Sequence, residues 1–173
     1  MSHLQKTKRF TYLALFSAMA ITLNMLETAI LTPFLGILRV GLANIIALMT
    51  IEILGVKEMI IVNLMRVLIG SLLSGMFLGT SFWISAGGVL LSSLTLYLCN
   101  KAKSSLLFTS VMSSIAHSVG QVIIVIFLYK QLMVASILPY FLLFSIPAGF
   151  LTGSIAKLAL KRVKPLKESR PED

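Results

Sequence analysis

The chain has 173 residues, of which 57% are apolar and only 12% are charged. A soluble domain carries about a quarter charged residues, so this composition, with a mean hydropathy of +0.96, excludes an ordinary soluble domain. The net charge of +9 arises from 15 Lys and Arg against six Asp and Glu. Most cations flank a long apolar body, which is the layout of a membrane protein and excludes a nucleic-acid-binding face.

Acidic residues are scarce, and the only aspartate is Asp173 at the end of the chain. This excludes an aspartate-rich magnesium–diphosphate site, an EF-hand and an aspartyl dyad. A single cysteine, Cys99, and two histidines exclude an intrachain disulfide and a Cys/His metal site. Neither a Walker A sequence nor a serine-hydrolase motif occurs. We therefore expect no catalytic activity, no metal and no cofactor.

Six apolar segments are long enough to cross a bilayer, which requires about 20 residues. They cover residues 10–28, 37–54, 59–78, 82–98, 105–129 and 133–160. Pro139 and Pro147 predict that the last segment is kinked or preceded by a short separate helix. Gly55 suits the end of the second helix, where a left-handed residue is common. The expected fold is an all-α integral membrane protein with six transmembrane helices.

Orientation follows from Lys and Arg in the connections. With a cytoplasmic N-terminus, the outer connections hold only Arg39 and Lys130, and the other loop and terminal cations lie inside. An even number of spans places both termini in the cytoplasm, at the cell membrane. We expect a basic N-terminus over 1–9, a membrane domain over 10–160 and a basic, disordered tail over 161–173.

Two helical stripes place polar residues at mid-depth, where they are costly and therefore candidates for function. The first contains Arg66, on a face shared with Asn63, Gly70 and Ser74. The second contains His117 and Gln121, on a face shared with Ser110 and Ser114. The stripes predict either a shared ligand cavity, to which His117 could add a proton-linked group, or polar pairs that hold helices together.

A second polar cluster is expected at the outer ends of the first two segments. Glu27 lies near the end of the first, Arg39 opens the second, and Asn44 lies further along it. One interpretation is a Glu27–Arg39 ion pair. The other is that the connecting loop caps a pocket from outside, with Arg39 reaching an anionic group of the ligand.

Small residues four apart indicate places where helices approach closely. Gly75 and Gly79, Gly149 and Gly153, and Ala14 and Ala18 form such pairs. Contact within the chain is one interpretation. Because the alanine pair lies near the cytoplasmic end of the first segment, a partner protein is the alternative there.

Four motifs together resemble a known family. They are Arg39-Val-Gly-Leu-Ala-Asn44, Lys57-Glu58, Arg66 with Gly70, and Ala116-His117-Ser-Val-Gly120-Gln121. Over about residues 8 to 160 the chain resembles the family called heptaprenyl diphosphate synthase component I, or the Gx transporter family. That family is similar to the S components of energy-coupling factor (ECF) transporters. These are six-helix bundles that bind vitamins or precursors from outside and dock onto a coupling subunit with two cytosolic ATPases.

The resemblance implies that Ala14 and Ala18 meet the coupling subunit and that a pocket lies near the outer face. The ligand-binding candidates from the two polar stripes and the outer cluster are Arg66, His117, Gln121, Asn44, Arg39 and Glu27. Three functions remain open. The first is an S-component-like subunit for uptake of a small vitamin-like, quinone or isoprenoid precursor. The second is a non-catalytic membrane subunit that assists polyprenyl diphosphate or quinone synthesis, and the third is a membrane scaffold without a small ligand.

Overall fold

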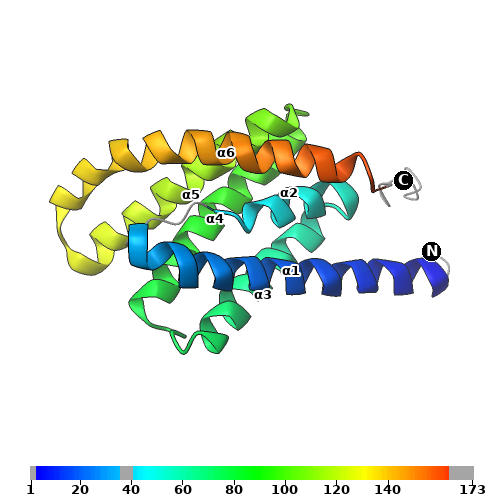
Figure 1. The fold of residues 1–173 in the computed structure, drawn as a ribbon, viewed down its shortest axis with the longest axis horizontal. Helices are drawn as coiled ribbons and strands as arrows, with labels where there is room; N and C mark the ends of the chain where they lie inside the picture. The colour runs from blue at the N-terminus through cyan, green and yellow to red at the C-terminus, as the bar shows by residue number, and fades with distance from the viewer. Residues whose placement is uncertain (1–2, 36–40, 164–173) are drawn as a thin grey trace.

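The computed structural model describes residues 3–35 and 41–163 as a bundle of helices, with no strand in these two stretches (Figure 1). The helices are α1 (His3–Leu35), α2 (Asn44–Ile53), α3 (Val56–Leu73), α4 (Thr80–Lys101), α5 (Leu106–Tyr129) and α6 (Leu138–Leu160). A short 3₁₀ helix, η1 (Leu132–Ile137), precedes α6. The prediction of an all-α fold with six principal helices is therefore confirmed.

Four stretches are long and apolar enough to cross a membrane: His3–Ile30, Thr80–Lys101, Leu106–Tyr129 and Leu132–Leu160. Helix α3 has 18 residues but contains Lys57, Glu58 and Arg66. Helix α2 has ten residues and is about 15 Å long, half the thickness of the hydrocarbon core. Six complete spans were predicted, but as described α2 reaches only part of the way across a bilayer.

Helix α2 lies at the centre of the bundle. Figure 1 shows it between α1 and α6, and nine of its ten residues, all but Glu52, are buried. Its apolar side chains pack in one core with Phe16 and Ala20 of α1, Met59 of α3 and Ala156 of α6. An apolar helix whose faces are all covered by protein needs no contact with lipid.

Glycine and proline mark the helix ends as expected from the sequence. Gly55 follows α2 with φ of 114°, and its N–H donates to the Thr50 carbonyl oxygen at 3.1 Å. Pro139 lies in the first turn of α6, and Pro147 lies inside this helix. The prolines predicted either a kink or a short separate helix. The structure has the short separate helix, η1, ahead of α6.

One ion pair ties α1 to the turn between α2 and α3. The Arg9 guanidinium contacts the Glu58 carboxylate and donates to the Leu54 carbonyl oxygen at 3.2 Å. The Arg9 cation lies at the C-terminal end of α2, which carries partial negative charge, and Glu58 lies in the first turn of α3, which carries partial positive charge. Both placements are therefore favourable. This contact fixes α1 against the central helix at the end of the bundle that contains the start of α1.

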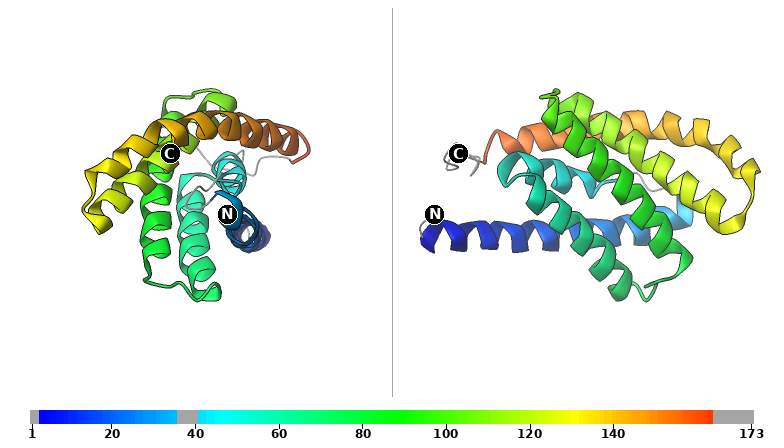
Figure 2. Two further views of the ribbon diagram at one scale, coloured as in Figure 1. Left: turned by 60° about the vertical axis from the view of Figure 1, so that its left-hand side comes forward. Right: turned by 180° about the vertical axis from the view of Figure 1, so that it is seen from behind.

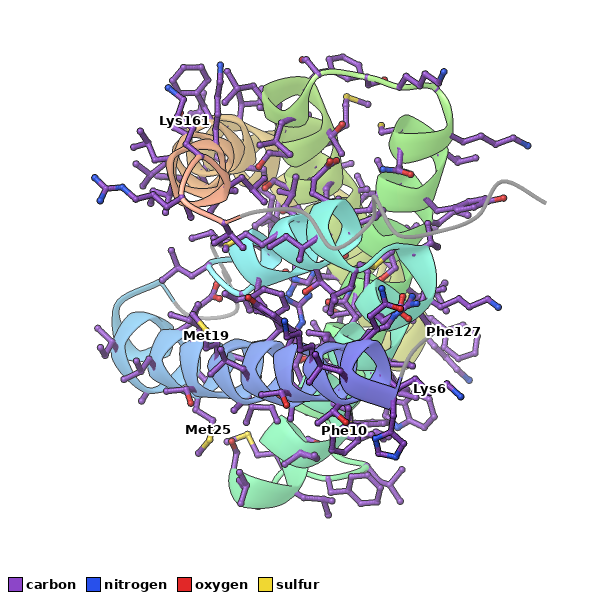
Figure 3. The ribbon with its side chains drawn as sticks, turned by 90° about the vertical axis from the view of Figure 1, so that its right-hand side faces the viewer. Lys6, Phe10, Met19, Met25, Phe127 and Lys161 are labelled. Atoms are coloured by element: carbon purple, nitrogen blue, oxygen red, sulfur yellow. The ribbon has the colours of Figure 1, made fainter. Side chains whose placement is uncertain are left out.

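The basic residues gather at that same end. The start of α1 and the end of α6 lie together there, and Figure 3 looks onto this end with Lys6 and Lys161 labelled. Lys57 is close by, because the neighbouring Glu58 pairs with Arg9. Lys130 follows α5 at the opposite end. Of the described cations named here, all but Lys130 lie at one end of the bundle, whereas Arg39, the other cation predicted in an outer connection, lies outside the described residues.

Glycines allow α4, α5 and α6 to pack closely. A Cβ atom on Gly120 of α5 would lie 2.4 Å from the Gly87 carbonyl oxygen of α4. Gly149 and Gly153 of α6 face Ser114 and Ser110 of α5. For this pair in α6, the interpretation as a contact within the chain is confirmed. Gly75 and Gly79 instead lie in the connection between α3 and α4.

Candidate functional site

A buried carboxylate anchors the start of the central helix. Glu27 of α1 is 4% exposed. Its Oε1 accepts a hydrogen bond from the Gly41 N–H at 2.5 Å, and its Oε2 accepts one from the Leu42 N–H at 3.1 Å. These residues immediately precede α2, and Gly41 has φ of +79°, which favours glycine. The carboxylate therefore satisfies backbone donors at the positive end of α2.

A buried arginine reaches the same end of α2 from the other side. Arg66 of α3 is 2% exposed, and its Nη2 donates to Asn44 Oδ1 at 3.1 Å. Asn44 is the first residue of α2, and its side chain packs against Gly41. Within the described residues, Asn44 Nδ2 has no hydrogen-bond partner. Glu27, Asn44 and Arg66 thus converge from three helices on one buried point, which we call the α2 cluster.

A small pocket lies between α1, α3 and α4. Its volume is about 20 Å³, which is room for about one water molecule. The pocket is lined by Val67, Gly70, Met76, Phe82 and six polar side chains, those of Asn24, Thr28, Ser71, Ser74, Ser81 and Ser85. Asn24 and Thr28 lie within one turn of Glu27 on α1, and Val67 and Gly70 lie within about one turn of Arg66 on α3, but none of Glu27, Asn44 and Arg66 lines the pocket.

The second predicted pair lies on α5. His117 and Gln121 are buried, and His117 Nε2 and Gln121 Nε2 are 3.2 Å apart. Both side chains press against Gly88 of α4, where a Cβ atom would come within 2.8 Å of the His117 ring. The His117 and Gln121 side chains lie between α4 and α5. A residue larger than glycine at position 88 would collide with them.

The two predicted stripes make their hydrogen bonds with different neighbours. On α3, Asn63 donates to Ser93 of α4, and Arg66 donates to Asn44 of α2. On α5, Ser110 pairs with Thr152 of α6 at 3.0 Å. These are the interhelical polar pairs that one interpretation of the stripes predicted.

A family model now adds to this geometry. The model for heptaprenyl diphosphate synthase component I matches residues 16–159. The matched segment runs from α1 into the last turn of α6 and contains both polar sites. This chain belongs to the heptaprenyl diphosphate synthase component I family. A search of curated proteins and a search of solved structures found no match.

In this family member, three of the six predicted ligand-binding residues, Glu27, Asn44 and Arg66, lie in the α2 cluster. Two others, His117 and Gln121, pair on α5. The sixth, Arg39, lies outside the described residues, and so does the predicted Glu27–Arg39 ion pair. The observed partners of Glu27 include the backbone N–H groups of Gly41 and Leu42. Of the predicted tail over 161–173, only residues 161–163 are described.

The predicted docking residues lie on the outer face of α1. Ala14 and Ala18 are exposed, in line with exposed Thr11 and Thr22. Both threonine hydroxyls donate to carbonyl oxygens of their own helix, Thr11 to Thr7 and Thr22 to Ala18. The alanine side chains are small, and the two threonine hydroxyl groups already donate within α1, which suits close approach of another helix at this face.

Several polar residues were not recognised from the sequence. Ser118 of α5 lies 2.5 Å from Ser145 of α6, oxygen to oxygen, and Ser93 of α4 accepts from Asn63 at 2.8 Å. Serine at helical spacing is common in membrane helices, so spacing alone did not distinguish these two. Gly41 had a usable signal, since a glycine just before a buried helix often has a positive φ.

Proposed function

We propose that this family member is a membrane-embedded substrate-binding subunit resembling the S components of ECF transporters. It takes up a small vitamin-like, quinone or isoprenoid precursor and delivers it to a coupling subunit with two cytosolic ATPases. It is non-catalytic, lies in the cell membrane and has both termini in the cytoplasm. The observation that carries the proposal is the α2 cluster, because ionisable side chains inside a membrane are costly to place there and are by default candidates for a functional site.

The chemistry of the α2 cluster favours a polar or anionic ligand. The cluster combines a guanidinium, a carboxylate, an amide and the positive end of a helix. A ligand of vitamin size needs roughly 300 Å³, and the pocket between α1, α3 and α4 has about 20 Å³. A ligand of this size does not fit without rearrangement, and in this proposal it displaces Asn44 and the segment that Glu27 holds and takes over their hydrogen bonds.

The Arg66→Gln variant tests ligand binding. Purified protein would be screened by thermal shift against vitamins, flavins, and quinone and prenyl precursors. We expect a hit whose affinity falls about 10- to 100-fold in Arg66→Gln, because a hydrogen bond to a charged group is lost. Arg162→Gln, which removes an exposed cation from the end of α6, is the control and should bind normally. A hit unaffected by Arg66→Gln would contradict the assigned site.

The outer face of α1 supports the docking part of the proposal. Ala14→Trp with Ala18→Trp should abolish co-purification with the coupling subunit and stop uptake, because two indoles prevent close helix approach. Ligand binding by the isolated protein should be unchanged. Leu143→Trp with Phe150→Trp, on the exposed face of α6, is the matched control. Uptake retained in the alanine double variant would refute docking through this face.

A second candidate function is favoured by the family match. The chain would be a non-catalytic membrane subunit that assists a soluble synthase in polyprenyl diphosphate synthesis. The described residues contain no group of three or more His, Cys, Asp or Glu that could hold a metal, so the soluble synthase would supply the acidic metal site in this proposal. Co-purification with a synthase, and altered quinone chain length on gene deletion, would favour this candidate over uptake.

A further inference from the structure

Helix α1 lies at the edge of the bundle, where it packs against α2 and α3 (Figure 2). Phe16 and Ala20 anchor it in the apolar core and are 4% and 0% exposed. Leu13 and Leu23 are partly buried and pack against the same core. Among residues 3–30, Leu23 is the last that packs against this core. The apolar anchoring of α1 within these residues therefore lies before its last two turns.

Beyond Leu23, the attachment of α1 is polar. Among residues 24–30, which we call the 24–30 segment, Glu27 is the only buried side chain. Its carboxylate accepts hydrogen bonds from the Gly41 and Leu42 N–H groups, just before α2. Helices in a membrane gain no hydrophobic free energy by associating, so packing and polar contacts hold them together. A segment with few buried apolar contacts opens at lower free energy than the rest of the fold.

A cavity lies against the same segment. The pocket of about 20 Å³ between α1, α3 and α4 is lined by Asn24 and Thr28 from α1 and by Gly70 from α3. A Cβ atom on Gly70 would lie 3.0 Å from Asn24 Nδ2, so these two residues touch. Protein interiors are close-packed elsewhere. The segment thus lies on α3 through an amide against a glycine, and this contact can separate without opening the apolar core.

A place where α1 can bend lies at Thr22. Its hydroxyl donates to the Ala18 carbonyl oxygen at 2.9 Å, and a threonine bonded to the carbonyl four residues earlier often bends a helix. Thr22 is exposed and lies between buried Ala20 and the 24–30 segment. A bend here moves the segment while Ala20 stays in the core. Leu23 is the apolar contact that such a bend must break.

We propose that the 24–30 segment is a gate, which bends away from α3 at Thr22 to admit the ligand to the α2 cluster. Opening separates Glu27 from Gly41 and Leu42 and enlarges the pocket between α1, α3 and α4 from its α1 side. The ligand is the small polar or anionic molecule that suits the α2 cluster, so the role in entry rests on the proposed function. The bending itself rests on the packing of α1 alone.

Hydrogen exchange of the Gly41 and Leu42 amides tests the gate without a ligand. Both N–H groups are bonded to Glu27, so they exchange when the gate opens. The full chain in phosphatidylcholine nanodiscs would be compared by mass spectrometry with Leu23→Ala and Leu13→Ala. We expect about tenfold faster exchange in Leu23→Ala, because the contact that resists bending is truncated. Leu13→Ala, truncated on the same core, should exchange like the wild type. Equal exchange in the two variants would overturn the proposal.

A reversible lock gives a second test. Asn24→Cys with Gly70→Cys, in a Cys99→Ser background, places two thiols across the α1–α3 contact. Oxidation closes this contact, and dithiothreitol opens it again in the same protein. Ser118→Cys with Ser145→Cys is the matched control, because the two serine oxygens lie 2.5 Å apart between α5 and α6. Mass spectrometry confirms each disulfide and circular dichroism confirms folding, and the alanine comparison decides if the lock does not form.

The oxidised lock should slow exchange at Gly41 and Leu42 by about tenfold or more. It should also abolish the Arg66-dependent thermal shift with the ligand, and reduction should restore both. The control disulfide should change neither. Ligand binding by the oxidised lock at wild-type affinity, or unchanged exchange, would overturn the gate. Slowed exchange without any ligand in the screen would support the gate and count against the proposed uptake function.

Discussion

Replacing Glu27 with leucine is expected to lower the free energy of unfolding by about 3 to 5 kcal/mol. The two N–H groups of Gly41 and Leu42 lose their acceptor, and each buried donor left unsatisfied costs about 1 to 3 kcal/mol. The α2 helix also loses the negative charge beside its positive end. Thermal unfolding of the purified protein in detergent, followed by circular dichroism, measures the effect.

Glu27→Gln is the control for this prediction. Glutamine keeps one carbonyl oxygen in nearly the same shape, so one of the two N–H groups remains bonded. Its melting temperature should fall between those of the wild type and Glu27→Leu. Equal melting temperatures for Glu27→Leu and the wild type would contradict the role given to the carboxylate at the start of α2.

Gly120→Ala is expected to separate α4 from α5 and to destabilise the protein by about 2 kcal/mol. The new Cβ would lie 2.4 Å from the Gly87 carbonyl oxygen and 3.0 Å from the Gly88 Cα. Both are backbone atoms and cannot move aside alone. Overpacking costs about 3 kcal/mol, and the better helix propensity of alanine returns about 1 kcal/mol. The same thermal unfolding assay measures the loss.

Gly79→Ala provides the comparison, because Gly79 lies at the start of α4 with an ordinary φ of −74°. Its Cβ would lie 3.2 Å from the Met76 carbonyl oxygen, a tight contact that requires a shift of only a few tenths of an ångström, so its melting temperature should fall much less than that of Gly120→Ala. If Gly120→Ala were as stable as Gly79→Ala, the close α4–α5 approach would not be needed for stability.

The sequence predicted which residues are buried better than it predicted their partners. Arg66 and His117 were expected inside the bundle because a polar group facing lipid is costly, and both are buried. Their partners come from tertiary packing, which spacing along one helix cannot reveal. The partner of Arg66 on α2 is 22 residues away, and Glu27 bonds with backbone N–H groups 14 and 15 residues away.

The length of α2 shows a different limit of the sequence. Hydropathy cannot distinguish an apolar helix that faces lipid from one enclosed by other helices, because both are apolar on all sides. Residues 37–54 therefore resembled a complete span, whereas the described helix is Asn44–Ile53. The end of α2 was easier to predict, since Gly55 is a local signal that needs no tertiary contact.

The enclosure of α2 also sets an order for biosynthesis. One wall of its core comes from α6, through Ala156, which is synthesised roughly one hundred residues after α2. At about 5 to 20 residues per second, that delay is on the order of 5 to 20 seconds. During this interval α2 has no cover on its α6 side. The bundle can therefore close around its central helix only when the last helix has been made.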